Sequence, residues 1–104
     1  QKLTYYESIH TLIRALKEEK SKKKIYLWGA GGRGLSFLYN DGKLMIDKVI
    51  DSSIDRQGIP LGQYGNVISP NEIVSNSIIV LLNSRYLYLI PNQIKNKNQI
   101  FLLS

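Results

Sequence analysis

One short segment carries residue types whose spacing is suited to binding phosphate. Glycines stand at positions 29, 31 and 34, directly after the strand-forming run 24–28 and directly before the helix-forming stretch 35–39. In this strand–loop–helix order, a Gly-x-Gly-x-x-Gly loop exposes backbone N–H groups to an anion, and the helix dipole favours the negative charge. We therefore predict a phosphate-binding loop made of Gly29, Ala30, Gly31, Gly32, Arg33 and Gly34.

Each patterned glycine has its own expected task. Gly29 permits the tight turn off the strand, Gly31 leaves room for phosphate beside the backbone, and Gly34 lets the helix pack close to the strand. Arg33 stands inside the loop, so we expect its guanidinium to pair with a phosphate through charge-assisted hydrogen bonds. A solvent-exposed arginine at a helix start is the alternative interpretation.

A carboxylate follows at the distance that nucleotide binding requires. A second strand is expected over 45–50, and Asp51 ends it 20 positions after Gly31. The dinucleotide-binding fingerprint places a carboxylate there, which accepts hydrogen bonds from ribose hydroxyls. A turn-capping role for Asp51 in the loop 51–53 fits the pattern equally well.

A third polar segment is expected at the same edge of the sheet. Asn83, Ser84 and Arg85 follow the continuous apolar run 78–82, which is typical of a parallel strand buried on both faces. Ligands of doubly wound sheets bind outside the carboxyl ends of the strands. We therefore expect these three residues to join the glycine loop and Asp51 in one nucleotide-binding crevice.

The rest of the chain supplies the elements that hold these residues in place. We expect a helix over 4–20, strands over 24–28, 45–50, 78–82 and 99–103, a long loop over 51–66, a short edge strand at 67–68, a short helix over 69–75, and a helix from 85 that Pro91 interrupts. This alternation predicts a doubly wound, mostly parallel, Rossmann-like α/β sheet preceded by an N-terminal helix. The expected organisation is one domain over 1–104, with the leading helix in 1–22 and the α/β core in 23–104.

Two local patterns set helix ends in this prediction. The spacing Thr4-Tyr5-Tyr6-Glu7 resembles a capping box, so the leading helix is expected to start there. Its apolar stripe would consist of Tyr5, Ile9, Leu12, Ile13 and Leu16. Gly42 follows the helix after the glycine loop and is expected to form a left-handed cap.

Composition excludes several function classes. The chain has 104 residues, no cysteine and one histidine, His10, so a disulfide scaffold, a thiolate metal site and a His cluster are excluded. No apolar run approaches the length of a membrane span, and no signal-peptide pattern is present. We expect a cytoplasmic protein. Because the chain does not open with Met, we also expect a fragment of a longer protein.

The net charge of +6 comes partly from lysines at 17, 20 and 22–24. A nucleic-acid interface would use such residues as phosphate contacts. They lie, however, at the expected amino end of the sheet, opposite the glycine loop, and no basic–aromatic nucleic-acid module follows. We expect a solvated basic face, with neither nucleic acid nor a membrane as partner.

Several landmarks together resemble a known family. They are 26–34, 49–51, 56–58 with Pro60 and Gly62, and 68–70. Over most of its length the chain resembles the small Rossmann-like C-terminal domain of sugar C-methyltransferases and related polysaccharide-biosynthesis proteins. The chain is also similar to the nucleotide-sugar-binding N-terminal domain of sugar acyltransferases, but that domain usually lacks a long leading helix.

The resemblance implies a C-terminal accessory domain that holds a nucleotide-diphosphate sugar beside an upstream catalytic domain of the same protein. S-adenosylmethionine would be the cofactor of that parent methyltransferase, and this fragment would hold none. Arg33 occupies the place of a basic residue common in the family. The chain lacks the family's zinc-binding cysteines and its S-adenosylmethionine domain, so no catalytic residue is carried over.

Two other function classes stay open. The chain could be the NAD-binding part of a dehydrogenase, although one glycine loop with one mononucleotide-sized half is not a complete dinucleotide enzyme. Asp51 would disfavour the 2′-phosphate of NADP. It could also be a regulatory module that senses a nucleotide, and oligomeric assembly is compatible with each class. Without a nucleophile–base pair, we expect no catalytic turnover from this chain alone.

Overall fold

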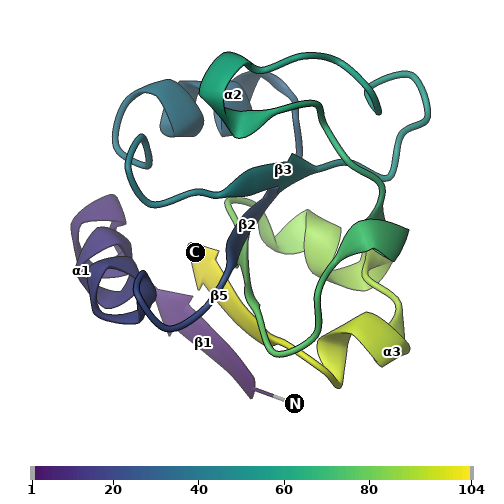
Figure 1. The fold of residues 1–104 in the computed structure, drawn as a ribbon. Helices are drawn as coiled ribbons and strands as arrows, with labels where there is room; N and C mark the ends of the chain where they lie inside the picture. The colour runs from purple at the N-terminus through teal and green to yellow at the C-terminus, as the bar shows by residue number, and fades with distance from the viewer. Residues whose placement is uncertain (1, 104) are drawn as a thin grey trace.

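The computed structural model describes residues 2–103, and within them five strands form one sheet in which every neighbouring pair is parallel (Figure 1). The strands are β1 (Lys2–Tyr6), β2 (Ile25–Trp28), β3 (Lys48–Ile50), β4 (Ile78–Leu81) and β5 (Gln99–Leu103), in the spatial order β1-β5-β4-β2-β3. The α-helices of the same residues are α1 (Ile9–Glu19), α2 (Gly32–Tyr39) and α3 (Asn92–Lys95). The predicted fold class, a parallel Rossmann-like α/β sheet, is confirmed.

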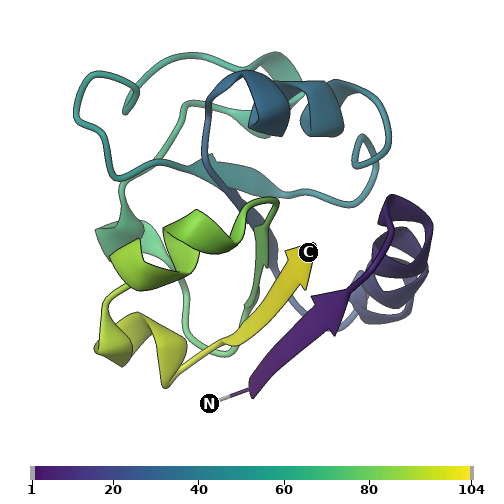
Figure 2. The same cartoon turned by 180° about the vertical axis from the view of Figure 1, so that it is seen from behind.

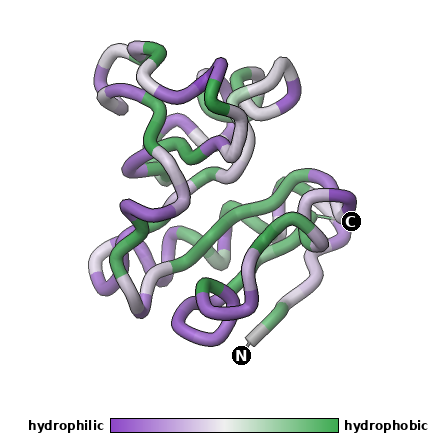
Figure 3. The backbone as a smooth tube through the Cα atoms, turned by 90° about the vertical axis from the view of Figure 1, so that its right-hand side faces the viewer, coloured by the Kyte–Doolittle hydropathy of each residue, from purple (hydrophilic) through white to green (hydrophobic). Residues whose placement is uncertain are grey.

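Helical layers cover both faces of the sheet. Helices α1 and α2 pack on one face, whereas the 3₁₀ helix η3 (Ser84–Leu89) and α3 pack on the other (Figures 1 and 2). Every residue of β2 and of β4 is buried, because alternate side chains enter the two opposite cores. Figure 3 shows the resulting pattern, with hydrophobic strands inside and hydrophilic segments mostly at turns and outer surfaces. This two-sided burial explains the continuous apolar runs in the sequence.

The predicted start of the leading helix is wrong. Lys2–Tyr6 is strand β1, which pairs with β5 in a parallel register that runs from Lys2↔Gln99 to Tyr6↔Leu103. Helix α1 begins only at Ile9, and its N-cap is Ser8, whose side chain accepts a hydrogen bond from the N–H of Thr11. The strand forms because it covers the edge of β5, and the Tyr6 ring lies 5.2 Å from that of Phe101 between centroids.

The later part of the predicted apolar stripe is correct. Leu12 and Leu16 are fully buried under the sheet, whereas Tyr5 is exposed because it belongs to the edge strand. His10 lies on the surface, as expected for a histidine off the stripe.

The segment between β2 and β4 is less regular than predicted. Strand β3 begins at Lys48 rather than at 45, and only Ile68 of the expected edge strand pairs, through a single bridge with Ile50. The capping box at Ser69 is confirmed, but it opens one 3₁₀ turn, η2 (Pro70–Glu72), rather than a helix over 69–75. The turn is closed by the N–H of Glu72, which donates to the carbonyl oxygen of Ser69 at 3.1 Å, and by the N–H of Ser69, which donates to the carboxylate of Glu72 at 3.1 Å.

Gly42 does not adopt the predicted left-handed conformation. The reason for glycine at this position is packing: a Cβ there would overlap the ring of Phe37, which is buried at the end of α2. The N–H of Gly42 donates to the carbonyl oxygen of Phe37 at 2.8 Å, which closes the helix end.

The C-terminal third follows its prediction in order but not in every element. The helix expected from 85 is the 3₁₀ helix η3, which begins at Ser84, and the strand expected over 78–82 ends at Leu81. Asn83 caps η3, since its side-chain oxygen accepts from the N–H of Arg85 at 2.9 Å. Pro91 then separates η3 from α3, as a residue without an N–H and with a fixed φ should. Strand β5 follows over the predicted residues.

Candidate functional site

The glycine loop lies where the strand order of the sheet reverses. From β2 the chain passes to β3 on one side, and then to β4 on the opposite side of β2. The carboxyl ends of β2 and β4 therefore face a crevice of the kind in which parallel α/β sheets bind ligands. A pocket of about 200 Å³ occupies this place. Its walls are Trp28, Gly29, Gly31, Gly32, Arg33, Gly34, Arg56, Leu82, Asn83 and Tyr86.

Two of the three glycine roles agree with the geometry. Gly29 has a φ of +116°, a conformation that an L side chain rarely adopts, so it makes the turn off β2. At Gly34, a Cβ would overlap the backbone carbonyl oxygen of Gly29. The first turn of α2 therefore packs directly against the end of β2, which only glycine permits.

Gly31 differs from its prediction in one respect. Its φ of −81° and ψ of −176° are ordinary extended values, so its backbone does not demand glycine. A Cβ would instead lie 3.1 Å from Nη1 of Arg56, which reaches across the loop. The open space beside Gly31 is thus shared with a guanidinium group.

The start of α2 presents unbonded donors to the pocket. Gly31 is the N-cap and α2 begins at Gly32, and no hydrogen bond between described residues uses the N–H groups of Gly31, Gly32, Arg33 or Gly34. These are the donors that a helix leaves without an intrahelical partner. Together with the helix dipole and the exposed Arg33 side chain, they give the pocket an anion-attracting wall.

Asp51 is buried and does not line the pocket. One carboxylate oxygen, Oδ2, accepts from the N–H of Ala30 at 2.8 Å, and Oδ1 accepts from the N–H of Ser53 at 2.8 Å. These bonds are those of the turn-capping interpretation, extended to the glycine loop. Ala30 accordingly has its N–H committed to Asp51 and acts by positioning the loop. Ribose binding by Asp51 stays a prediction.

The segment after β4 contributes only one of its three predicted residues to the pocket wall. Asn83 lines the pocket, whereas Ser84 and Arg85 are exposed and do not. The side-chain oxygen of Asn83 holds the N–H of Arg85, so its amide NH₂ is the group left to face a ligand.

Sequence reasoning missed four residues of the pocket wall, namely Trp28, Arg56, Leu82 and Tyr86. Trp28 and Leu82 stand at the carboxyl ends of their apolar runs, and this position was a usable signal. Arg56 belongs to the long loop after β3, and no local pattern indicates that this loop folds back over Gly31. Tyr86 lies on η3, and its ring is 3.6 Å from the position that a Cβ on Gly29 would take.

Comparison with known proteins adds no assignment. No family model matches the chain, and neither the curated proteins nor the solved structures contain a match. Within residues 2–103, no three His, Asp or Glu side chains are grouped to hold a metal ion. The helices of that same part of the chain are all too short or too polar to cross a membrane.

Proposed function

We propose that this chain is a nucleotide-sugar-binding accessory domain that holds the diphosphate of its ligand at the glycine loop. The observation that carries the proposal is the pocket at the switch point, whose walls include four loop glycines and two arginines. A cavity at that point of a parallel sheet is the expected ligand site of the fold. The positive lining favours an anionic ligand.

Phosphate is the anion that this wall suits best. The described residues leave several N–H groups at the start of α2 without a hydrogen bond, and at a helix N-terminus a phosphate can accept from more than one such group. Arg33 adds a planar group of five N–H donors, which matches phosphate oxygens in pairs. Asn83, with a free amide NH₂, supports the far side of the same ligand.

The size of the pocket supports partial enclosure of the ligand. About 200 Å³ is smaller than the roughly 300–1,000 Å³ of sites that enclose a whole small molecule. A diphosphate fits this space, while a sugar and a base would extend beyond it. In the proposal, an upstream catalytic domain of the same protein covers the rest of the ligand. That parent would be a methyltransferase of polysaccharide biosynthesis using S-adenosylmethionine, as the family resemblance implies.

Thermal stabilisation by ligands tests this function. A pyrimidine-diphosphate sugar should raise the melting temperature more than NAD does at equal concentration, because one mononucleotide-sized half of the fold accommodates one nucleotide with its diphosphate, and the second nucleoside of NAD would lack a matching half-site. At ten times Kd the stabilisation is about 1.4 kcal/mol, or several degrees for a chain of this size.

The controls separate specific phosphate binding from general charge effects. Arg33→Ala should weaken binding by about 1–2 kcal/mol, since a charge-assisted bond is lost, and most of the stabilisation at the same ligand concentration should disappear. Arg85→Ala removes an equal charge outside the pocket and should leave the shift unchanged. A larger shift with NAD would favour the dehydrogenase-like or sensor alternative, and no shift with either ligand would contradict the proposal.

A further inference from the structure

A second arginine reaches the pocket from a different part of the chain. Arg56 belongs to the loop after β3, and its guanidinium lies over Gly31 of the loop after β2. Measured from where a Cβ on Gly31 would be, Nη1 is 3.1 Å away, Cζ 3.6 Å and Nη2 3.7 Å. The glycine loop is therefore covered by a cation, although the two segments are 25 positions apart in the sequence.

Arg56 is held in this place by one long contact. Its Nη1 lies 3.5 Å from Oδ2 of Asp51, at the outer limit of a hydrogen bond. The Arg56 side chain is 46% exposed, whereas that of Asp51 is 8% exposed. Because a guanidinium has five N–H donors, most of its donor capacity stays available to a ligand.

The backbone that carries Arg56 is anchored. The N–H of Arg56 donates to the carbonyl oxygen of Ser53 at 3.1 Å, and the side-chain amide of Gln57 donates to the carbonyl oxygen of Asp51 at 2.9 Å. The N–H of Gly58 donates to Val67 at 2.8 Å. The side chain can therefore turn about its own bonds while its Cα stays beside the pocket.

Asp51 does not depend on Arg56 for its hydrogen bonds. Each carboxylate oxygen already accepts from a backbone N–H at 2.8 Å, from Ser53 or from Ala30. A guanidinium that leaves Asp51 for a phosphate exchanges one long contact for shorter, paired ones. The glycine loop keeps its support during this exchange.

We propose that Arg56 is the specificity-determining residue of this pocket, an arm that leaves Asp51 and closes on the second phosphate of a diphosphate. This inference rests on the proposed function. The first phosphate is seated on the N–H groups of α2 and on Arg33, and it needs no contribution from Arg56. A second phosphate extends past Gly31 and meets the guanidinium. The buried charge of Asp51 remains fixed behind the loop.

Titration with inorganic pyrophosphate and orthophosphate tests the inference without any choice of base or sugar. Trp28 is the one tryptophan of the chain and lines the pocket, so its fluorescence reports binding. The wild type should bind pyrophosphate more tightly than orthophosphate. Arg56→Ala should weaken pyrophosphate binding about tenfold or more, as loss of a charged hydrogen bond does. Its affinity for orthophosphate should stay within about twofold of the wild type.

Two further variants make the result specific. Arg56→Lys keeps the charge but loses the paired donors, so its affinity for pyrophosphate should lie between those of the wild type and Arg56→Ala. Arg85→Ala should bind both anions with the affinity of the wild type. Circular dichroism and melting temperature establish that each variant is folded, and the half-exposed Arg56 side chain should be replaceable without unfolding.

The contradicting outcomes are distinct. If Arg56→Ala lowers the affinity for both anions equally, or for neither, Arg56 does not determine specificity. In that case binding of the anions by the wild type would still support the proposed function. If the folded wild type binds neither anion, the proposed function fails and this inference fails with it.

Discussion

The carboxylate of Asp51 accepts a hydrogen bond from the backbone N–H of Ala30 at 2.8 Å. This bond joins the end of β3 to the glycine loop that follows β2, and it fixes the loop from behind. Among the residues that the structure describes, no hydrogen bond uses the N–H groups of the next four residues, which line or adjoin the pocket at the start of α2. The fingerprint assigns the carboxylate at position 51 to ligand binding. In this structure the same carboxylate fixes the conformation of the glycine loop through Ala30.

Replacement of Asp51 should therefore destabilise the fold itself. Asp51→Ala leaves the N–H groups of Ala30 and Ser53 without their acceptors, and the free energy of unfolding should fall by about 2–3 kcal/mol. Asp55→Ala is the matched control, because Asp55 is exposed and should change stability by less than about 0.5 kcal/mol. Urea denaturation measures both. If Asp51→Ala lost ligand affinity with unchanged stability, the ribose interpretation would be favoured instead.

The two helical glycines at 32 and 34 should respond to alanine in opposite ways. Gly34→Ala places a Cβ against the carbonyl oxygen of Gly29, and since this is backbone it cannot yield, so a loss of about 2–3 kcal/mol is expected. Gly32→Ala meets nothing within 4 Å and should be neutral or stabilise by up to about 1 kcal/mol. Thermal melting of both variants checks this, and equal effects would show that α2 does not pack on Gly29 as described.

Alkaline pH should destabilise the protein through Tyr64. Burial raises the pKa of Tyr64 above its ordinary 10.0 and is the largest cause of the shift. A hydrogen bond with Gln63 lowers this pKa, and the nearby Tyr39 raises it further. A raised pKa in the folded state means that the contribution to stability is complete below the ordinary pKa and is lost as pH rises through the folded one. The contribution of Tyr64 to the unfolding free energy should thus be constant up to about pH 9 and be lost progressively above about pH 10.

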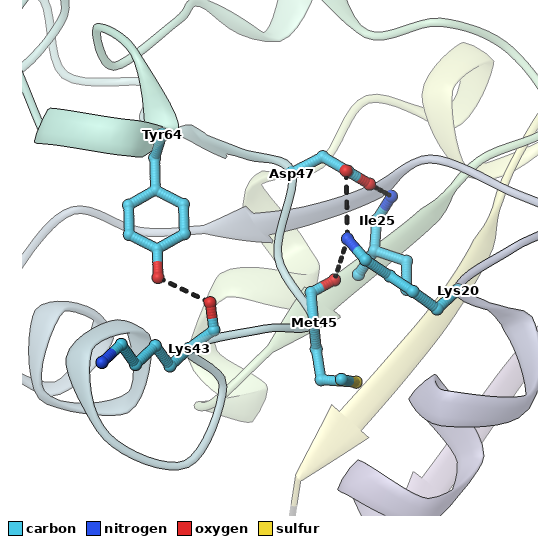
Figure 4. A network of polar contacts seen from close by, with 6 residues as sticks. All are labelled: Lys20, Ile25, Lys43, Met45, Asp47 and Tyr64. Atoms are coloured by element: carbon cyan, nitrogen blue, oxygen red, sulfur yellow. Dashed lines mark hydrogen bonds and ion pairs between the residues drawn. The ribbon is translucent and has the colours of Figure 1, made fainter.

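Tyr64→Phe tests the assignment of this transition. The hydroxyl donates to the carbonyl oxygen of Lys43 at 2.7 Å, so the variant should lose about 1 kcal/mol at neutral pH and show a smaller alkaline decline (Figure 4). Tyr6, whose pKa burial also raises, supplies the remaining decline. Tyr88→Phe is the control at an exposed site. An unchanged alkaline decline in Tyr64→Phe would assign the transition to other groups.

At the amino edge of the sheet, Asp47 should matter more than its ion-pair partner. Its Oδ2 accepts from the N–H of Ile25 at 2.8 Å, and its Oδ1 lies 3.1 Å from Nζ of Lys20, which also donates to Met45 (Figure 4). Asp47→Ala removes the acceptor of a β2 N–H and should cost about 1–3 kcal/mol. Lys20→Ala breaks a partly exposed ion pair and should cost less than about 1 kcal/mol. A reversed order in chemical denaturation would contradict this interpretation of the network.

Local patterns were enough to predict the centre of the fold. The apolar run before Gly29, the run ending at Leu82 and the cap at Asn83 each appear in a few consecutive residues, and each lies where it was predicted. Strand β1 could not be predicted in this way. Its partner β5 comes from the opposite end of the chain, and the spacing of Thr4 and Glu7 imitates a helix cap that Ser8 in fact provides.

The candidate site also has a part that local patterns predict and a part that depends on distant segments. The glycine loop is a contiguous motif, so its strand, turn and helix follow from the sequence. Arg56 and Tyr86 reach the pocket only because a loop and a 3₁₀ helix fold back toward Gly29 and Gly31. The course of these two segments depends on tertiary contacts, for example the hydrogen bond from the side chain of Gln57 to the carbonyl oxygen of Asp51. Local sequence patterns do not predict such contacts.

Amide chemical-shift mapping tests the central claim most directly, because it locates a ligand on the chain residue by residue. Titration of the ¹⁵N-labelled protein with a pyrimidine-diphosphate sugar should give its largest shifts at the amides of Gly31, Gly32, Arg33 and Gly34, with smaller ones at Asn83. Arg33→Ala should reduce these shifts at equal ligand concentration. Shifts concentrated at the lysines 22–24 of the opposite edge, or none at the glycine loop at millimolar ligand, would contradict a phosphate site there.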